Sequence, residues 1–293
     1  MAWTLADITA RLQGRILYFG DPSRSWSLAQ FDAAFVQVKT WGFDGVAPKL
    51  SDGQGTDYAT DADLRAIIAK AKVHGLTCWP WVGVSKGTPQ RWADICSEMA
   101  HATGLAFIDV EAPADFHAFM PEYRAKTPEN FPVLCTCGGN PVTWSTGWPG
   151  QTAVQEGVVF SPQWYGASWK SGYCSGLPPD QCINKADAEW IRVAGPSVIL
   201  VPSLNFDGLS AAEVTAFASY AARWKSPVLW WHYGVMTNAY AAAIMAAPVG
   251  FPVSSAPDPC ADVKAQLAQT QTQLADALDR LRQIGALAQG AVK

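Results

Sequence analysis

The sequence has few charged residues, no long apolar run and no cluster of basic residues. Only 16% of its 293 residues are charged, the formal net charge is −4, and Lys and Arg form no run. Since nucleic acids and anionic membranes are bound through basic patches, neither partner is expected. No window approaches the roughly 18 uninterrupted apolar residues of a membrane span. We therefore expect no membrane span and no nucleic-acid interface.

A targeting signal is also lacking. The segment from Met1 to Asp7 has no basic stretch followed by apolar residues, so no secretory signal is expected. The sequence leaves the localisation unassigned. If the protein acts outside the cell that makes it, lysis or a place in a virion would have to bring it there.

Metal-ligand and phosphate-binding patterns are missing as well. The four histidines show no ligand spacing, and no phosphate-binding Gly-rich loop or Gly-x-Ser-x-Gly motif occurs. The seven cysteines fit neither a disulfide scaffold nor a metal site. Cys135 and Cys137 are expected on one face of a strand, and Cys174 and Cys182 bracket a loop that a disulfide could bridge. Reduced, partly buried thiols are the simpler interpretation, and no cofactor or metal is predicted.

What the sequence does contain is a repeat of short strand-like runs separated by helical patterns. Successive runs start about 26 to 40 residues apart, which suits a strand, a loop and a helix repeated eight times. The predicted strands are Arg15–Gly20, Asp44–Lys49, Leu76–Val82, Leu105–Val110, Phe131–Thr136, Gly157–Tyr165, Ser197–Ser203 and Pro227–His232.

The intervening helices have recognisable starts and stops. Helices are predicted over Ala62–Val73 and Gln90–Thr103, each followed within two residues by a glycine. Ser210 and Glu213 have the spacing of a capping box, in which hydroxyl and carboxylate satisfy backbone amides. The segment Asn140–Gly150 is rich in Pro, Gly and Trp and predicts only a short helix there.

This alternation predicts an α/β protein whose residues 1–247 form a (β/α)8 TIM barrel. Strands such as Val198–Val201 are apolar on both faces, as parallel strands are when helices cover them outside and side chains fill the barrel inside. A doubly wound open sheet would show the same alternation. The count of eight strands favours the closed barrel.

The composition changes after the barrel. Residues 248–259 form a Pro/Ser linker without periodicity, and residues 260–293 predict an amphipathic helix. Its apolar residues follow alternating steps of three and four, which predicts a coiled coil that makes the protein a homo-oligomer through residues 260–288. A lone helix packed on the barrel is the alternative. The seam comprises Cys260, Val263, Leu267, Thr270, Leu274, Ala277, Leu281, Ile284 and Ala288.

An acidic pair at the end of the fourth predicted strand is the clearest chemical signal. Side chains two apart on a strand share a face, so Asp109 and Glu111 are expected to point together into the barrel mouth. Two neighbouring carboxylates repel each other, and this favours a proton on the more buried one. A protonated carboxyl group can donate to a glycosidic oxygen. A loop-capping or salt-bridged pair is the structural alternative.

Other polar and aromatic residues follow the predicted strands and are expected at the same mouth. Aromatic rings there could stack on sugar faces, although aromatic side chains also bury large areas in any core, which favours packing for each ring taken alone. The candidates are Asp21, Lys49, Asp52, Gln163, Tyr165, Asn205, Asp207, His232 and Tyr233, with Trp79, Trp81 and Trp231 as the aromatic group.

Three of these motifs resemble the family 25 glycoside hydrolases, which are barrel lysozymes that cut the β-1,4 bond after N-acetylmuramic acid. They are Asp21 after the first strand, the segment Ile108–Glu111, and the segment Trp230–Tyr233. The resemblance implies that Glu111 is the general acid, that Asp109 orients and polarises the substrate's acetamido group or steadies the developing positive charge, and that Asp21 assists. It also implies that Tyr165 and Tyr233 belong to sugar subsites.

The sequence also departs from that family. Asp21 stands in a Phe-Gly-Asp-Pro-Ser context instead of Gly-x-Asp-x-Ser, and the segment Lys49–Gly53 keeps only the general form of the family's second strand. Family 18 chitinases share the Asp-x-Glu ending but need a further Asp where this chain has Phe107, which argues against a chitinase. A broader set of glycosidase-like barrels has similar segments.

Three functional hypotheses follow. The first is a retaining glycosidase acting on an N-acetylated polysaccharide, above all peptidoglycan, as a phage or cell-wall lysin. The second is a catalytically silent barrel that binds glycan and is displayed in several copies by the helix as a tail or adhesion module. The third makes the barrel a scaffold and the C-terminal helix the functional part.

Overall fold

The computed structural model describes residues 5–12, 14–20, 26–51, 61–84, 89–110, 113–128, 130–138, 150–165, 177–206, 208–221 and 228–247. The chain divides into two units, Met1–Val253 and Ser254–Lys293, and all described residues belong to the first. The predicted linker and coiled-coil helix lie outside the described residues and stay predictions. None of the described helices is long and apolar enough to cross a membrane.

The strands form one closed parallel sheet. Its order is β1-β9-β8-β7-β6-β5-β4-β2-β3, and β1 also pairs with β2, which closes the ring. β3 and β4 both pair with β2 and together occupy the third strand position of the barrel. The barrel therefore has eight strand positions, which we call staves. The strands are β1 (Arg15–Phe19), β2 (Gly45–Ser51), β3 (Thr77–Cys78), β4 (Trp81–Val84), β5 (Ala106–Val110), β6 (Val133–Gly138), β7 (Val158–Tyr165), β8 (Ser203–Asn205) and β9 (Val228–Trp231).

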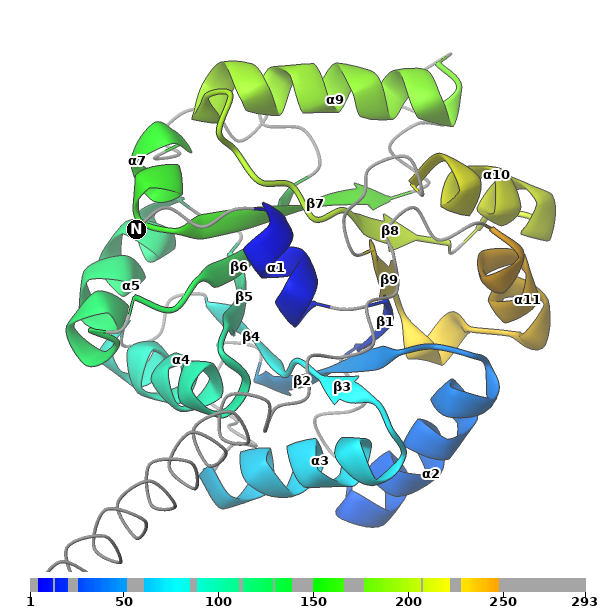
Figure 1. Ribbon diagram of the computed structural model, residues 1–293, viewed down its shortest axis with the longest axis horizontal. Helices are drawn as coiled ribbons and strands as arrows, with labels where there is room; N and C mark the ends of the chain where they lie inside the picture. The colour runs from blue at the N-terminus through cyan, green and yellow to red at the C-terminus, as the bar shows by residue number, and fades with distance from the viewer. Residues whose placement is uncertain are drawn as a thin grey trace, which may run out of the picture. The chain divides into compact units, whose positions relative to one another are not determined.

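Helices alternate with the staves and surround the ring, which confirms the predicted (β/α)8 barrel (Figure 1). The helices are α1 (Leu5–Arg11), α2 (Leu28–Thr40), α3 (Asp61–Val73), α4 (Pro89–Thr103), α5 (Pro113–Lys126), α7 (Gly150–Gln155), α9 (Pro179–Ala194), α10 (Ala211–Ala221) and α11 (Asn238–Ala246), with a short 3-10 helix η4 (Tyr233–Val235).

The predicted capping box and the predicted glycines at the helix C-termini are also confirmed. The backbone N–H of Ser210 donates to Glu213 Oε2 at 2.7 Å, and the backbone N–H of Glu213 donates to Ser210 Oγ at 3.3 Å, which is the reciprocal pair of a capping box. Gly75 and Gly104, which follow α3 and α4, have φ of 65° and 82°, a conformation that glycine adopts at little cost. In the fifth unit the structure describes the six-residue helix α7, which begins at Gly150, whereas residues 140–149 of the predicted short helix lie outside the described residues.

Two strand predictions need correction. The predicted third strand is broken between β3 and β4 because Pro80 has no N–H for the ladder. The predicted strand Ser197–Ser203 is displaced, because β8 starts at Ser203 and only an isolated bridge joins Leu200 to Phe160. The helix α1, which precedes β1, was not predicted.

Helix α1 covers the N-terminal end of the barrel, where it lies in front of the ring of strands (Figure 1). Its Arg11 side chain donates from Nε to the backbone oxygen of Gly104, directly before β5, at 3.3 Å. Since α1 leads into β1 and β5 belongs to the fourth stave, the helix spans the opening. Ile8 and Leu12 are fully buried beneath it.

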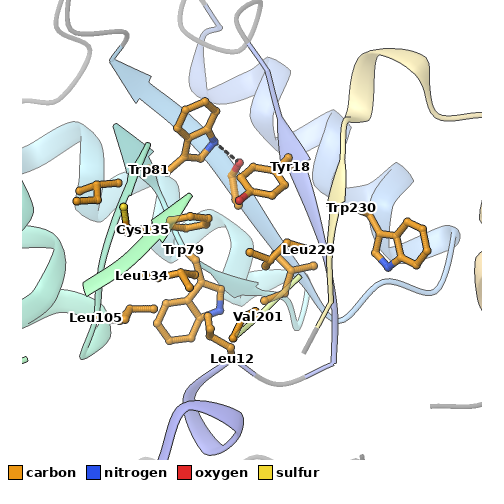
Figure 2. Packing of buried hydrophobic residues seen from close by; sticks show 14 of the residues in the cluster. Leu12, Tyr18, Trp79, Trp81, Leu105, Leu134, Cys135, Val201, Leu229 and Trp230 are labelled. Atoms are coloured by element: carbon orange, nitrogen blue, oxygen red, sulfur yellow. Dashed lines mark hydrogen bonds between the residues drawn. The ribbon is translucent and has the colours of Figure 1, made fainter. Parts of the chain in front are cut away.

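Strand register separates side chains that face the barrel interior from those that face the helices. Tyr18 on β1 pairs with Ala47, and Asp109 on β5 pairs with Thr136, so each pair shares a face. Near the N-terminal end the interior is apolar, with Trp79 surrounded by aliphatic side chains (Figure 2). These neighbours are Leu12, Leu105, Leu134, Val201 and Leu229, all 1% exposed or less.

The outward-facing side chains pack beneath the helices. Cys135 and Cys137 lie on this face of β6, which confirms that they share a face, and both side chains are buried. Burial raises the pKa of the Cys135 thiol well above its usual value, and the charge of Asp109 raises it further. Burial also raises the pKa of Cys78 and Cys96.

Candidate active site at the barrel mouth

Five inward-facing residues mark the C-terminal ends of the staves. They come from β2, β5, β7, β8 and β9, and each is only partly buried, whereas inward residues at the other end of the same strands are buried. Solvent therefore reaches the interior from the C-terminal end, where barrel enzymes carry their catalytic groups. The five residues are Lys49, Asp109, Gln163, Asn205 and Trp231.

Asp109 is the best-defined group of this mouth. Its Oδ1 accepts a hydrogen bond of 2.6 Å from the Thr136 hydroxyl and one of 3.1 Å from Gln163 Nε2. The donors stand on the next two staves, β6 and β7, so the carboxylate is tied to the barrel wall on one side. Both of these donors are neutral. The prediction that Asp109 faces the barrel interior is confirmed.

An aromatic group lies beside and below the polar residues. The ring of Tyr18 contacts Trp81, Phe107 and Trp231 with centroid distances of 5.8, 5.4 and 5.5 Å. Trp81 and Trp231 are 6.0 Å apart. These edge and tilted contacts lock the rings against one another, and Trp231 remains partly exposed above them.

Trp81 also supports Lys49. The lysine Nζ lies 4.8 Å from the centroid of the Trp81 ring, within the range of a cation–π interaction. The indole N–H of Trp81 donates to the backbone oxygen of Ala47 at 3.0 Å, and Figure 2 shows this hydrogen bond as a dashed line. The bond holds the ring that Lys49 contacts. A positive group is thus held at the same mouth as the Asp109 carboxylate.

A chain of hydroxyl groups crosses the interior just below the mouth. Tyr18 Oη lies 3.1 Å from Ser203 Oγ, which in turn lies 2.7 Å from Ser161 Oγ. All three residues are buried, and their hydroxyl groups satisfy one another in a region that water does not reach. This layer separates the apolar N-terminal half of the interior from the polar mouth.

Several predicted site residues lie outside the described part of the chain. They are Asp21, Asp52, Glu111 and Asp207, together with the side chain of Tyr165, whose backbone ends β7. Their assignment to the mouth stays a prediction. Within the described residues, no group of three or more His, Cys, Asp or Glu side chains is placed to hold a metal ion.

The structure assigns three predicted sugar-binding aromatics to packing instead. Trp79 is 6% exposed and lies in the apolar layer next to α1, at the opposite end from the mouth. Trp81 is at the mouth but only 2% exposed, so its ring supports Lys49 and Trp231 from below. Tyr233 stacks on the outward-facing Phe19 at 4.8 Å and 9° and contacts Trp26, between η4 and the barrel wall.

The predicted mouth residue His232 serves the local backbone. It precedes η4, and its Nδ1 accepts from the backbone N–H of Gly234 at 3.2 Å. Gly20 lies against it, because an added Cβ would stand 3.4 Å from His232 Nδ1 and 3.7 Å from the Trp231 ring. Both distances are ordinary van der Waals contacts, so Gly20 is a close neighbour of the end of β9.

Sequence reasoning missed Thr136 and Tyr18. Thr136 was placed at the end of a predicted strand without a role, and it proves to be the closest described partner of Asp109. The signal that identifies it is the pairing of Asp109 with Thr136 across β5 and β6, which puts both side chains on the inner face. Periodicity within one strand does not supply this register.

No protein-family model matches the sequence, and no curated protein is similar to it at a significant level. Similar solved structures exist. The Rhizomucor miehei endo-1,4-β-mannanase has a TM-score of 0.56 at 9% identity, over 75% of this chain and 86% of that chain. The Thermomonospora fusca β-mannanase bound to mannotriose has a TM-score of 0.52 at 17% identity, over 75% and 78%. An endogalactoceramidase has a TM-score of 0.53 at 14% identity, over 76% and 70%. At these identities the likeness establishes the barrel fold.

Proposed function

We propose that this protein is a glycoside hydrolase that acts at the C-terminal mouth of its barrel. The observation that carries the proposal is the inward-facing Asp109, fixed by Thr136 and Gln163 beside the partly exposed Trp231. The glycan-cleaving activities in the names of the mannanases of similar fold support it. A carboxylate, a cation and a partly exposed indole ring around one opening suit a substrate with many hydroxyl groups and flat apolar faces.

In the proposed mechanism Glu111 and Asp109 have different roles. Glu111, two residues beyond Asp109, protonates the glycosidic oxygen as the leaving group departs. Asp109 acts as a carboxylate that aligns the substrate's acetamido group, whose oxygen attacks the anomeric carbon as the glycosidic bond breaks. Water, deprotonated by Glu111, then opens this cyclic intermediate, and the two displacements together give retention. The two hydrogen bonds that Asp109 accepts favour its charged form, which suits the aligning role. Asp21 assists from the first stave.

An N-acetylated polysaccharide, above all peptidoglycan, is the proposed substrate. The resemblance of the segments around Asp21, Asp109 and Trp231 to family 25 lysozymes supports this choice over mannan. Self-association through residues 260–288 would then present several barrels to one cell-wall surface.

A panel of polysaccharides tests the proposal. The full chain is incubated with peptidoglycan, chitooligosaccharides and β-mannan, and new reducing ends are measured. We expect reducing ends from peptidoglycan and none from the Glu111→Gln variant, which keeps the size of the side chain and removes the acid. Release from β-mannan alone would keep the hydrolase and reject the N-acetylated substrate. Turnover by Glu111→Gln equal to that of the wild type would reject the mechanism.

A glycan-binding barrel without activity is the second candidate, and it is favoured by the departure of the segment Lys49–Gly53 from the family pattern. Binding of soluble glycan without any reducing-end release would support it. Deleting residues 258–293 and measuring the mass in solution shows whether the tail makes the binder multivalent. An unchanged mass would remove the self-association.

A further inference from the structure

We infer that Thr136 is a positioning residue for Asp109, and that together with Gln163 it makes Oδ1 the anchored oxygen of that carboxyl group and Oδ2 the oxygen that carries any proton. The inference rests on the proposed function for its catalytic meaning. Its structural content concerns two strands of the barrel wall and can be measured without a substrate.

The first step concerns the Thr136 hydroxyl hydrogen. A hydroxyl group has one hydrogen to donate, and two acceptors lie near Thr136 Oγ1. Asp109 Oδ1 is 2.6 Å away and the backbone oxygen of Ile108 is 3.3 Å away. The shorter distance is that of a hydroxyl donating to a charged oxygen, so the hydrogen points to Asp109.

The second step concerns the Asp109 oxygen itself. Gln163 Nε2, which only donates, approaches the same Oδ1 at 3.1 Å. An oxygen that accepts from two donors is poorly placed to hold a proton of its own. Oδ1 therefore remains an acceptor, and protonation of Asp109 takes place at Oδ2.

The third step concerns rigidity. Thr136 is 3% exposed and its β-branched side chain has few rotamers, so its hydroxyl group has a fixed place on β6. Asp109 and Thr136 are paired in the strand register, which keeps their separation constant. The barrel wall thereby sets the plane of the carboxylate, as a preorganised site requires.

Matched variants of Thr136 test this role. Thr136→Val keeps the shape and removes the donor, whereas Thr136→Ser keeps the donor. We expect Thr136→Val to lower kcat/KM on peptidoglycan by about 10- to 100-fold, the value of a hydrogen bond to a charged group. Losing a donor to the charged form raises the pKa of Asp109, so the acidic limb of the pH profile moves to higher pH. In Thr136→Ser we expect kcat/KM and the position of the acidic limb to stay close to their wild-type values.

A titration separates this inference from the proposed function. The carboxyl carbon of Asp109 is followed by NMR in aspartate-labelled protein, and its signal is identified by its loss in Asp109→Asn. The inference requires that the signal titrates at higher pH in Thr136→Val than in the wild type and in Thr136→Ser. A wild type without glycan cleavage but with this shift would reject the hydrolase and keep the positioning role.

An identical titration in the wild type and Thr136→Val would overturn the inference even in an active enzyme. If Thr136→Val shows no cooperative unfolding transition, Gln163→Leu decides, because it removes the second donor from a partly exposed position on β7. Its Asp109 signal must then move in the same direction. A Gln163→Leu signal at the wild-type position would equally overturn the inference.

Discussion

The two ends of the barrel interior are built by the same strands and differ in nearly every chemical property. Next to α1 the interior consists of Trp79 and aliphatic side chains with almost no exposed surface. At the opposite end Lys49, Asp109 and Trp231 are partly exposed and interact with neighbouring staves. Two residues along a strand, about 6.6 Å, are enough to pass between these regions. Substitutions at the apolar end should therefore change the free energy of unfolding, whereas substitutions at the mouth should change activity or glycan affinity.

The largest expected effect is that of Asp109→Asn at the mouth. The amide keeps the size of the side chain but loses the charge that Thr136 and Gln163 stabilise, so kcat/KM on peptidoglycan should fall at least about 100-fold. The thermal midpoint should change little, because the site lies outside the apolar layer. A variant as active as the wild type would show that the polar end contains no catalytic carboxylate at this position.

The next largest effect is expected at the closed end. Trp79→Ala removes a ring that is 6% exposed among Leu105, Leu134 and Val201. Such truncations lower the free energy of unfolding by about 3–5 kcal/mol, which urea denaturation measures. The kcat of the folded fraction should stay at the wild-type value. A drop in kcat at full folding would contradict the separation of the two ends.

Substitution of Trp231 at the mouth, unlike that of Trp79, should affect glycan affinity more than stability. Trp231→Ala removes the partly exposed ring above Tyr18, and we expect the affinity for soluble glycan to fall about tenfold, equal to 1.4 kcal/mol. Trp231→Phe should keep most of the affinity because an aromatic face remains. Calorimetric titration with a chitooligosaccharide or a peptidoglycan fragment measures both. Equal affinity in Trp231→Ala and the wild type would remove this ring from the binding site.

The smallest effect is expected from the cap of α10, on the mouth side of the barrel. Ser210→Ala removes the hydroxyl group that accepts from the Glu213 amide and should lower the free energy of unfolding by about 1 kcal/mol. Ser210→Thr, which retains a hydroxyl group, should recover part of this loss. Neither variant should alter kcat/KM, and a changed kcat/KM would couple this loop to the site.

Much of the fold is predictable from the sequence because each unit has its own local signals. The glycines that follow Val73 and Thr103 and the capping box at Ser210 act within a few residues, and all were confirmed. The displaced β8 was not predicted, because apolar residues before a strand resemble the strand itself. The break at Pro80 was missed although proline lacks the N–H that a strand ladder uses. Helix α1 was missed because its burial depends on a barrel that forms from distant residues.

Only those features of the site that follow from the alternation of side chains within a single strand were predictable. Alternation along β5 predicts the direction of Asp109, and the structure agrees. The same alternation places Trp79 and Trp81 on one inner face, yet only their height along the stave decides which is near the mouth. Tyr233 left the predicted site because the chain turns into η4 after β9, which sends its ring to Phe19. The position of a side chain along the barrel axis and the direction of the chain after a strand both depend on tertiary structure.

The Arg11–Gly104 hydrogen bond and the buried residues Ile8 and Leu12 make one opening of the barrel a sealed floor. Of the two ends of the barrel, the C-terminal mouth is therefore the one through which a ligand can reach the interior, because buried side chains fill the barrel behind it. Substitutions in α1 should consequently leave ligand access unchanged.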